Sequence, residues 1–160
     1  MGVEIERKFL VADRSVVASL SGTAMRQGYL SIDPERTVRV RVSGVRAFVT
    51  IKGPPSDSGA SRAEYEYEIP VPEAEELLDR LALRPLIEKT RYRVAVGRLV
   101  WEIDVFTGAN DGLVVAEVEL SSEATAVVLP DWIGEEVTGD PRYYNASLVS
   151  HPYRDWPRTG

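Results

Sequence analysis

The chain has 160 residues, of which 44% are hydrophobic and 28% charged, and its formal net charge is −6. This length and composition predict one globular domain over residues 1–160 and exclude a disordered or membrane-embedded class. The acidic balance argues against broad binding to nucleic acid or to an anionic membrane, although a local basic site is compatible with it.

Two residue counts restrict the chemistry. The sequence has no cysteine, which excludes disulfides, zinc-thiolate sites and thiol nucleophiles. Its single histidine, His151, excludes a multi-histidine metal site, and we interpret it as a surface residue. The chain shows neither the apolar run of a signal peptide nor the roughly 18 apolar residues of a membrane span, so a cytoplasmic location is expected by default.

Alternation of apolar and polar residues predicts a mainly β protein. Turn-forming residues separate the runs, and "VSGVR" and "AVGR" are short enough for hairpin turns. The predicted strands are residues 4–11, 25–31, 36–43, 46–53, 62–70, 88–96, 98–106 and 113–121.

Three segments have helical rather than alternating patterns. In residues 72–83, Ala74, Leu77, Leu78 and Leu81 recur at helical spacing behind an acidic first turn, which predicts a helix. Helices are also predicted over residues 13–20 and 141–150. The sequence "GPPSDSGASR" is typical of a mobile loop.

Each predicted strand has one charged face and one apolar face. In residues 36–43, Arg39 and Arg41 alternate with valines. The corresponding charged positions elsewhere are Glu4, Glu6, Lys8, Lys52, Glu64, Glu66, Glu68, Lys89, Arg91, Arg93, Glu102, Asp104, Glu117 and Glu119. Basic and acidic positions are concentrated in different strands.

Two architectures fit this pattern. In a sandwich, the charged faces would meet solvent. In a closed barrel with helices outside, the same faces would line the interior. Consecutive like charges on one face repel each other unless an opposite charge lies between them, which favours the barrel.

A barrel lined with lysine and arginine would attract a compact polyanion such as a phosphate chain. Carboxylates beside phosphates would repel them unless a divalent cation lies between the two. Glu4 and Glu6 are therefore interpreted as ligands of Mg²⁺ or Mn²⁺, and Lys8 as a substrate contact.

The ordered set of motifs resembles the CYTH superfamily, the triphosphate tunnel metalloenzymes. The first motif is "EIERKFL", which is similar to the Glu-x-Glu-x-Lys signature of that family. The resemblance continues through "QGYL", "VRVR", "TIK", "RAEYEYEI", "EKTRYR", "WEIDVF", "GLVVAEVEL" and "WIGEEVTGDPRYYNASL". It implies an α+β, mainly β fold: an antiparallel eight-stranded barrel with a few helices packed outside.

The resemblance also implies roles for individual residues. The substrate ligands would be Lys8, Arg39, Arg41, Lys52, Lys89 and Arg91. The metal ligands would be Glu4, Glu6, Glu117, Glu119, Glu64 and Glu66. Arg93 and Asp104 lie on the charged faces of their strands, like these ligands, and are expected to complete the lining of the barrel.

Tyr29 is the candidate partner of a lysine base. The segment "RQGYLS" resembles a family segment whose tyrosine faces the tunnel, and crowding of Lys52 among cations would lower its pKa. The predicted catalytic residues are thus Lys52, Tyr29 and Lys8. Four aromatic residues lie on the apolar faces of their strands and are interpreted as packing residues: Tyr65, Tyr67, Tyr92 and Trp101. The segment "GEEVTGDPRYYN" is interpreted as the entry to a helix and an edge of the site.

The predicted function is metal-dependent hydrolysis of inorganic tripolyphosphate to pyrophosphate and phosphate. Thiamine triphosphatase, nucleoside triphosphatase, a class IV-type adenylate cyclase and a non-catalytic polyphosphate- or nucleotide-binding module remain as alternatives. The expected partner is a small polyanionic substrate, with Mg²⁺ or Mn²⁺ as cofactor and no nucleic acid or membrane partner. Both a monomer and a homodimer are compatible with the sequence.

Overall fold

The computed structural model describes residues 2–157, and antiparallel strands are the main secondary structure of this part of the chain. The strands are β1 (Gly2–Val11), β2 (Thr23–Ser31), β3 (Thr37–Ser43), β4 (Arg46–Lys52), β5 (Ser61–Ile69), β6 (Ile87–Val96), β7 (Leu99–Thr107), β8 (Val114–Glu119) and β9 (Ile133–Glu136). The first eight agree with the predicted strands to within a few residues. The short strand β9 was not predicted, because its four residues lack a buried, alternating face.

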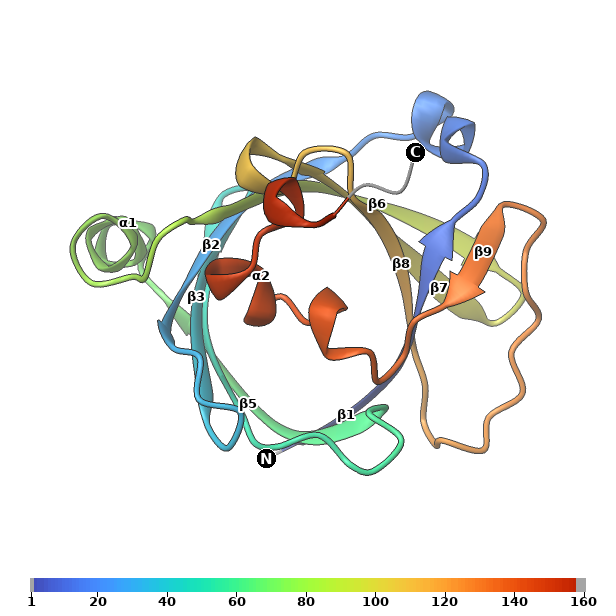
Figure 1. Ribbon diagram of the computed structural model, residues 1–160, viewed down its shortest axis with the longest axis horizontal. Coiled ribbons are helices and arrows are strands. Elements are labelled where there is room, and N and C mark those ends of the chain that lie inside the picture. Colours follow the sequence, from blue (N-terminus) through green and yellow to red (C-terminus); the bar gives the residue numbers. More distant parts are fainter. Residues whose placement is uncertain (1, 158–160) are drawn as a thin grey trace.

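Eight of these strands form a closed barrel. Neighbours follow the order β5-β4-β3-β2-β6-β7-β8-β1, and β1 also pairs with β5, which closes the ring. Strand β1 has neighbours on both edges. On one edge, residues 2–5 pair with β5 and residues 9–11 pair with β9. On the other edge, residues 6–10 pair with β8. Figure 1, a view into the barrel, shows this wall as a ring of strands. The predicted antiparallel eight-stranded barrel is confirmed.

The helix α1 (Val71–Arg80) packs on the outside of the barrel (Figure 1), as predicted from its apolar spacing. Ala74 and Leu78 are fully buried against Val40 and Ala47 of strands β3 and β4. Leu81, at the end of the predicted stripe, is instead 65% exposed because α1 ends one residue before it. A second predicted helix is a 3₁₀ helix, η1 (Arg14–Ser19). No helix among residues 2–157 is long and apolar enough to cross a membrane.

The apolar faces of several strands point outward and form a core between the barrel and its outer covering. Trp101 is fully buried there, with edge-to-face ring contacts to Phe9 at 5.4 Å and to Trp132 at 5.7 Å. Val16 and Val17 of η1 pack against the same cluster. Covering of this face explains why the charged face lies inside.

Tyr65 and Tyr67 do not follow this pattern. Their side chains lie on the outer face of β5 and are 37% and 58% exposed, so their interpretation as packing residues was wrong. No helix or loop within residues 2–157 buries these two positions of β5, whereas Tyr92 does pack against the Trp101 cluster. Parity alone placed the tyrosines on the correct face but did not reveal whether that face is covered.

One end of the barrel is covered by the C-terminal segment, residues 137–156, which we call the plug. It contains η3 (Pro141–Tyr143), α2 (Ser147–Ser150) and η4 (Tyr153–Asp155). Figure 1 shows it in red across the barrel opening. The side chains that seal this end form one cluster: Tyr29, Ile87, Phe106, Leu113, Val115, Val137, Tyr143, Leu148 and Val149. The barrel interior is therefore apolar beneath the plug and charged beyond it.

We predict that Leu148→Ala destabilises the protein by about 2–5 kcal/mol, because Leu148 is fully buried in the plug cluster. Chemical denaturation measures this change. Leu129→Ala is the control, since Leu129 is 51% exposed and its removal is expected to change stability by less than about 0.5 kcal/mol. Equal stabilities of the two variants would contradict the packing described for the plug.

Candidate active site

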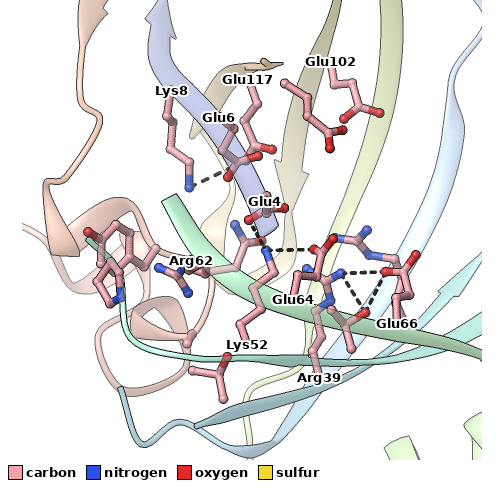
Figure 2. A pocket seen from close by; sticks show the side chains of 18 of the residues that line it. Glu4, Glu6, Lys8, Arg39, Lys52, Arg62, Glu64, Glu66, Glu102 and Glu117 are labelled. Atoms are coloured by element: carbon pink, nitrogen blue, oxygen red, sulfur yellow. Dashed lines mark hydrogen bonds and ion pairs between the residues drawn. The ribbon is translucent and has the colours of Figure 1, made fainter. Parts of the chain in front are cut away.

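The barrel encloses a cavity of about 680 Å³. All of the predicted site residues line it: Glu4, Glu6, Lys8, Tyr29, Arg39, Arg41, Lys52, Glu64, Glu66, Lys89, Arg91, Glu117 and Glu119. They come from seven strands, because each strand presents every second side chain to the interior. Figure 2 shows the acidic residues of β1 and β5 and the lysines Lys8 and Lys52 converging on this space.

Lys89 and Arg91 share the carboxylate of Asp104 in the barrel wall. Asp104 Oδ2 lies 2.8 Å from Lys89 Nζ, and Arg91 donates to both carboxylate oxygens, at 2.8 and 2.9 Å. Burial alone would raise the Asp104 pKa, but the charges of Lys89 and Arg91 outweigh it and hold that pKa well below its usual range. Asp104 therefore fixes the two cations from behind rather than lining the cavity as expected.

Two arginines of β3 retain unused capacity for an anion. The buried Arg39 Nε has no hydrogen-bond partner in the described chain, although Arg39 Nη2 donates to Thr50 at 3.2 Å. Burial, followed by the positive charges of Arg39 and Arg91, lowers the pKa of Arg41 to about 9. Glu66, 3.7 Å from Arg39 Nη2, balances only part of this positive charge, and a phosphate chain would supply the missing acceptors.

Lys8 and Lys52 are held by carboxylates. Lys8 Nζ lies 3.6 Å from Glu117 and donates to the Tyr143 carbonyl of the plug at 3.0 Å. Lys52 lies between Glu4, at 2.7 Å, and Glu64, at 3.6 Å. The expectation that Lys52 is crowded by cations was therefore wrong.

Lys89 has the surroundings that the sequence analysis assigned to Lys52. Burial lowers its pKa to about 7, with further lowering by Arg91 and Arg41 that Asp104 opposes. Strand parity showed that both lysines point inward, but it did not show which cations surround each of them.

Tyr29 lines the cavity but belongs to the apolar cluster under the plug. Among the described residues its hydroxyl forms no hydrogen bond to Lys52, so the expected lysine-tyrosine dyad is not assembled here. Arg93 and Glu102 line the cavity, with Arg93 largely exposed at 71% of its side chain. Glu68 instead forms an exposed ion pair with Arg46.

The carboxylates of β1, β5 and β8 repel one another. Burial and then Glu117 and Glu4 raise the pKa of Glu6 to about 8. Burial and then Glu4 raise the pKa of Glu64 to about 7. Within residues 2–157, Glu6 and Glu119 form no ion pair, whereas Glu117, between Lys8 and Arg91, is held ionised with a pKa of about 2.

This donor set fits a hard divalent cation. Carboxylate oxygens are its preferred ligands, and a cation would relieve the repulsion between Glu6, Glu117 and Glu119. In the described chain no three acidic residues already form a metal cage. Mg²⁺ commonly takes one or two carboxylates and completes its shell with substrate phosphates and water, so a partial set of ligands is sufficient.

The sequence analysis missed several residues in the cavity wall and behind it. Gln27 is fully buried and does not line the cavity, but it has the inward parity of its strand and was detectable from alternation. Tyr144 and Asn145 lie between η3 and α2, and Arg62 begins the inward row of β5. No periodic signal marks Tyr144 or Asn145, because the loop that carries them follows neither a strand nor a helix repeat.

A comparison with protein families matches residues 2–153 to the CYTH domain. The match covers nearly the whole chain and includes every strand of the barrel. The chain belongs to the CYTH family. The resemblance inferred from the motifs is thereby confirmed.

Two relatives of this CYTH protein are named inorganic triphosphatase. The protein from Acetivibrio thermocellus is 49% identical over 156 residues, which cover 98% of this chain and 99% of the relative. The protein from Nitrosomonas europaea is 43% identical over 151 residues, or 91% of this chain and 96% of the relative.

Solved structures agree with the family assignment. The crystal structure of the inorganic triphosphatase NE1496 has a TM-score of 0.63 and 39% identity, and the alignment covers 93% of this chain and 95% of that one. The PH1012 protein from Pyrococcus horikoshii OT3, at 21% identity and a TM-score of 0.58, covers 75% of this chain and 79% of its own. The latter likeness concerns the fold alone.

We predict that Glu6→Gln stabilises the metal-free CYTH protein at alkaline pH. The Glu6 pKa is raised from 4.5 to about 8, so the folded state holds its proton until the pH rises through about 8. Ionisation is then unfavourable in the fold, and stability falls with rising pH relative to the Gln variant. Thermal melting in EDTA should show little difference at about pH 5 and a higher melting temperature for Glu6→Gln at about pH 9.

Glu73→Gln on the outer helix α1 is the control for this experiment, because Glu73 is exposed and lies outside the cavity. A gain that is the same at both pH values would contradict the repulsion described for Glu6.

Proposed function

We propose that this CYTH protein is an inorganic triphosphatase that hydrolyses tripolyphosphate to pyrophosphate and phosphate within the barrel. The observation that carries the proposal is the buried, incompletely neutralised cationic wall formed by Arg39 and Arg41. Two relatives that are 49% and 43% identical over nearly their whole length are named inorganic triphosphatase, which supports the same activity.

The basic wall would bind and orient the phosphate chain. Arg39, Arg41 and Arg91 offer planar groups of donors to phosphate oxygens, while Lys8 and Lys89 add point charges. Asp104 holds Arg91 and Lys89 in place before substrate arrives, so these groups need little reorganisation. Fixed positive charge in an enclosed site can stabilise the charge that develops on the transferred phosphoryl group.

A divalent cation would be held by Glu6, Glu117 and Glu119, with Glu4 as a further candidate. When bound, the ion withdraws negative charge from the reacting phosphate. Glu64 and Glu66 stand farther along the acidic row, with Glu66 engaged by Thr50 at 2.7 Å. We propose that the bound ion is Mg²⁺ or Mn²⁺.

Aromatic residues in the cavity bear on the organic part of a substrate. Phe48 and Tyr144 both line it, but Arg46 lies over the Phe48 ring at 5.1 Å and Arg62 over the Tyr144 ring at 5.2 Å. One face of each ring is thus already covered by the protein's own cation. This arrangement favours free tripolyphosphate over a thiamine or nucleoside triphosphate.

We predict release of pyrophosphate and phosphate in equal amounts from tripolyphosphate with Mg²⁺ or Mn²⁺, and loss of turnover in EDTA. Ion-exchange chromatography of the products measures both. The substrate panel contains tripolyphosphate, thiamine triphosphate, ATP and pyrophosphate, with cyclic AMP monitored for ATP. A preference for an organic triphosphate would replace the proposed substrate, and binding without any hydrolysis would reduce the protein to a binding module.

We predict that Glu117→Gln lowers the rate of phosphate release by about a hundredfold or more while tripolyphosphate still binds, because a candidate metal ligand is lost and the basic wall remains. Phosphate release and calorimetric binding measure the two effects. Glu68→Gln is the matched control, since Glu68 is exposed and does not line the cavity, although its partner Arg46 does. Equal phosphate release by Glu117→Gln and the parent would contradict the proposed role of Glu117 in a metal-dependent hydrolase.

A further inference from the structure

The plug contributes an amide side chain to the charged part of the cavity. Asn145 lies in the loop between η3 and α2, and it lines the cavity beside the apolar cluster that seals this end of the barrel. Its Oδ1 accepts a hydrogen bond from Lys89 Nζ at 3.1 Å and another from Gln27 Nε2 at 2.9 Å. Asn145 therefore contacts Lys89, a candidate phosphate ligand, from the plug side.

The orientation of both amides is determined by residues that can only donate. Arg41 Nε donates to Gln27 Oε1 at 2.7 Å, and an arginine has no acceptor, so the Gln27 oxygen must face Arg41. The Gln27 NH₂ group consequently faces Asn145. An NH₂ group of a glutamine is only a donor, so the atom of Asn145 that meets Gln27 Nε2, and with it Lys89 Nζ, must be its oxygen.

The NH₂ group of Asn145 is left available by this arrangement. Asn145 Nδ2 forms no hydrogen bond to a described residue, and it is not among the buried polar atoms that lack a partner. It thus remains accessible at a residue that lines the cavity. A neutral donor next to Lys89 is chemically suited to an anionic oxygen.

We propose that Asn145 is a substrate-binding residue at the plugged end of the cavity, where its NH₂ group donates to an oxygen of the terminal phosphoryl group. The identity of the anion rests on the proposed function. Lys8, another candidate phosphate ligand, also contacts the plug, because its Nζ donates to the carbonyl of Tyr143. The plug thereby acts as the inner end of the binding site, and the phosphate chain extends from it toward the opposite opening.

The test is calorimetric binding of tripolyphosphate in EDTA, which does not require turnover. Asn145→Asp has nearly the same shape but places a carboxylate oxygen where the donor was. We expect it to weaken binding by at least about tenfold to a hundredfold, the effect of losing one hydrogen bond to a charged group. Asn145→Ala should weaken binding within that range, and in turnover assays both variants should raise KM more than they lower kcat.

Ser150→Asp is the matched control, since it adds the same charge to an exposed position of the plug that does not line the cavity. It should bind tripolyphosphate like the parent. Melting temperatures of all variants distinguish loss of folding from loss of binding.

Unchanged affinity of Asn145→Asp and Asn145→Ala, or equal weakening by Ser150→Asp, would overturn the inference. So would failure of the parent to bind tripolyphosphate. Binding by the parent and weakened binding by the Asn145 variants, without any hydrolysis, would overturn the proposed function but support the inference.

Discussion

Enclosure of the charged side of the sheet is the constraint on which the structure depends. The apolar sides of the strands are covered from outside by α1, by η1 and by the Trp132 region, which leaves the ionic side facing inward. Charges inside a closed barrel interact more strongly than charges in water, so their arrangement has large energetic consequences. Lys89 and Arg91 are balanced by Asp104, whereas Arg39 and Arg41 are not balanced to the same degree.

Four carboxylates of the cavity are concentrated on one part of its wall. Glu4, Glu6, Glu117 and Glu119 come from the neighbouring strands β1 and β8, where Lys8 pairs with Glu117 in the register of the sheet. Arg91 of β6 also lies 3.8 Å from Glu117, whereas Arg39 and Arg41 come from β3. An anion and a cation bound together would each relieve repulsion that the protein alone retains. This type of site is less stable when empty, which is a common consequence of building a functional site from charge.

Much of the fold was predictable because the strands obey a simple repeat. The alternation in β3, where Arg39 and Arg41 are separated by Val40, identified the strand and its inward face. The same rule located the acidic rows, and applied to β2 it would also have identified Gln27 as an inward residue. Alternation could not determine whether an apolar face is covered, so it did not reveal that Tyr65 and Tyr67 are exposed.

The pairing partners of individual charges depend on contacts between strands that are distant in sequence. Lys52 and Lys89 are both inward lysines on alternating strands, and a carboxylate contacts each of them, but Lys89 also has arginines close enough to lower its pKa. That difference follows from barrel closure and from the register of β1 with β5 and β8. Asn145 illustrates the same limit, because the plug loop has no repeat that would place it against Gln27 and Lys89.

Strand β1 pairs with three other strands, which also affects how the chain folds. Residues 2–11 are synthesised before their partners β5, β8 and β9, the last of which ends at residue 136. Contacts between such distant segments slow folding, because a long loop must close before they form. A growing polypeptide therefore cannot close the ring until β8 has been synthesised, so Glu4, Glu6 and Lys8 gain their neighbours on β8 only after residues 114–119 have been added.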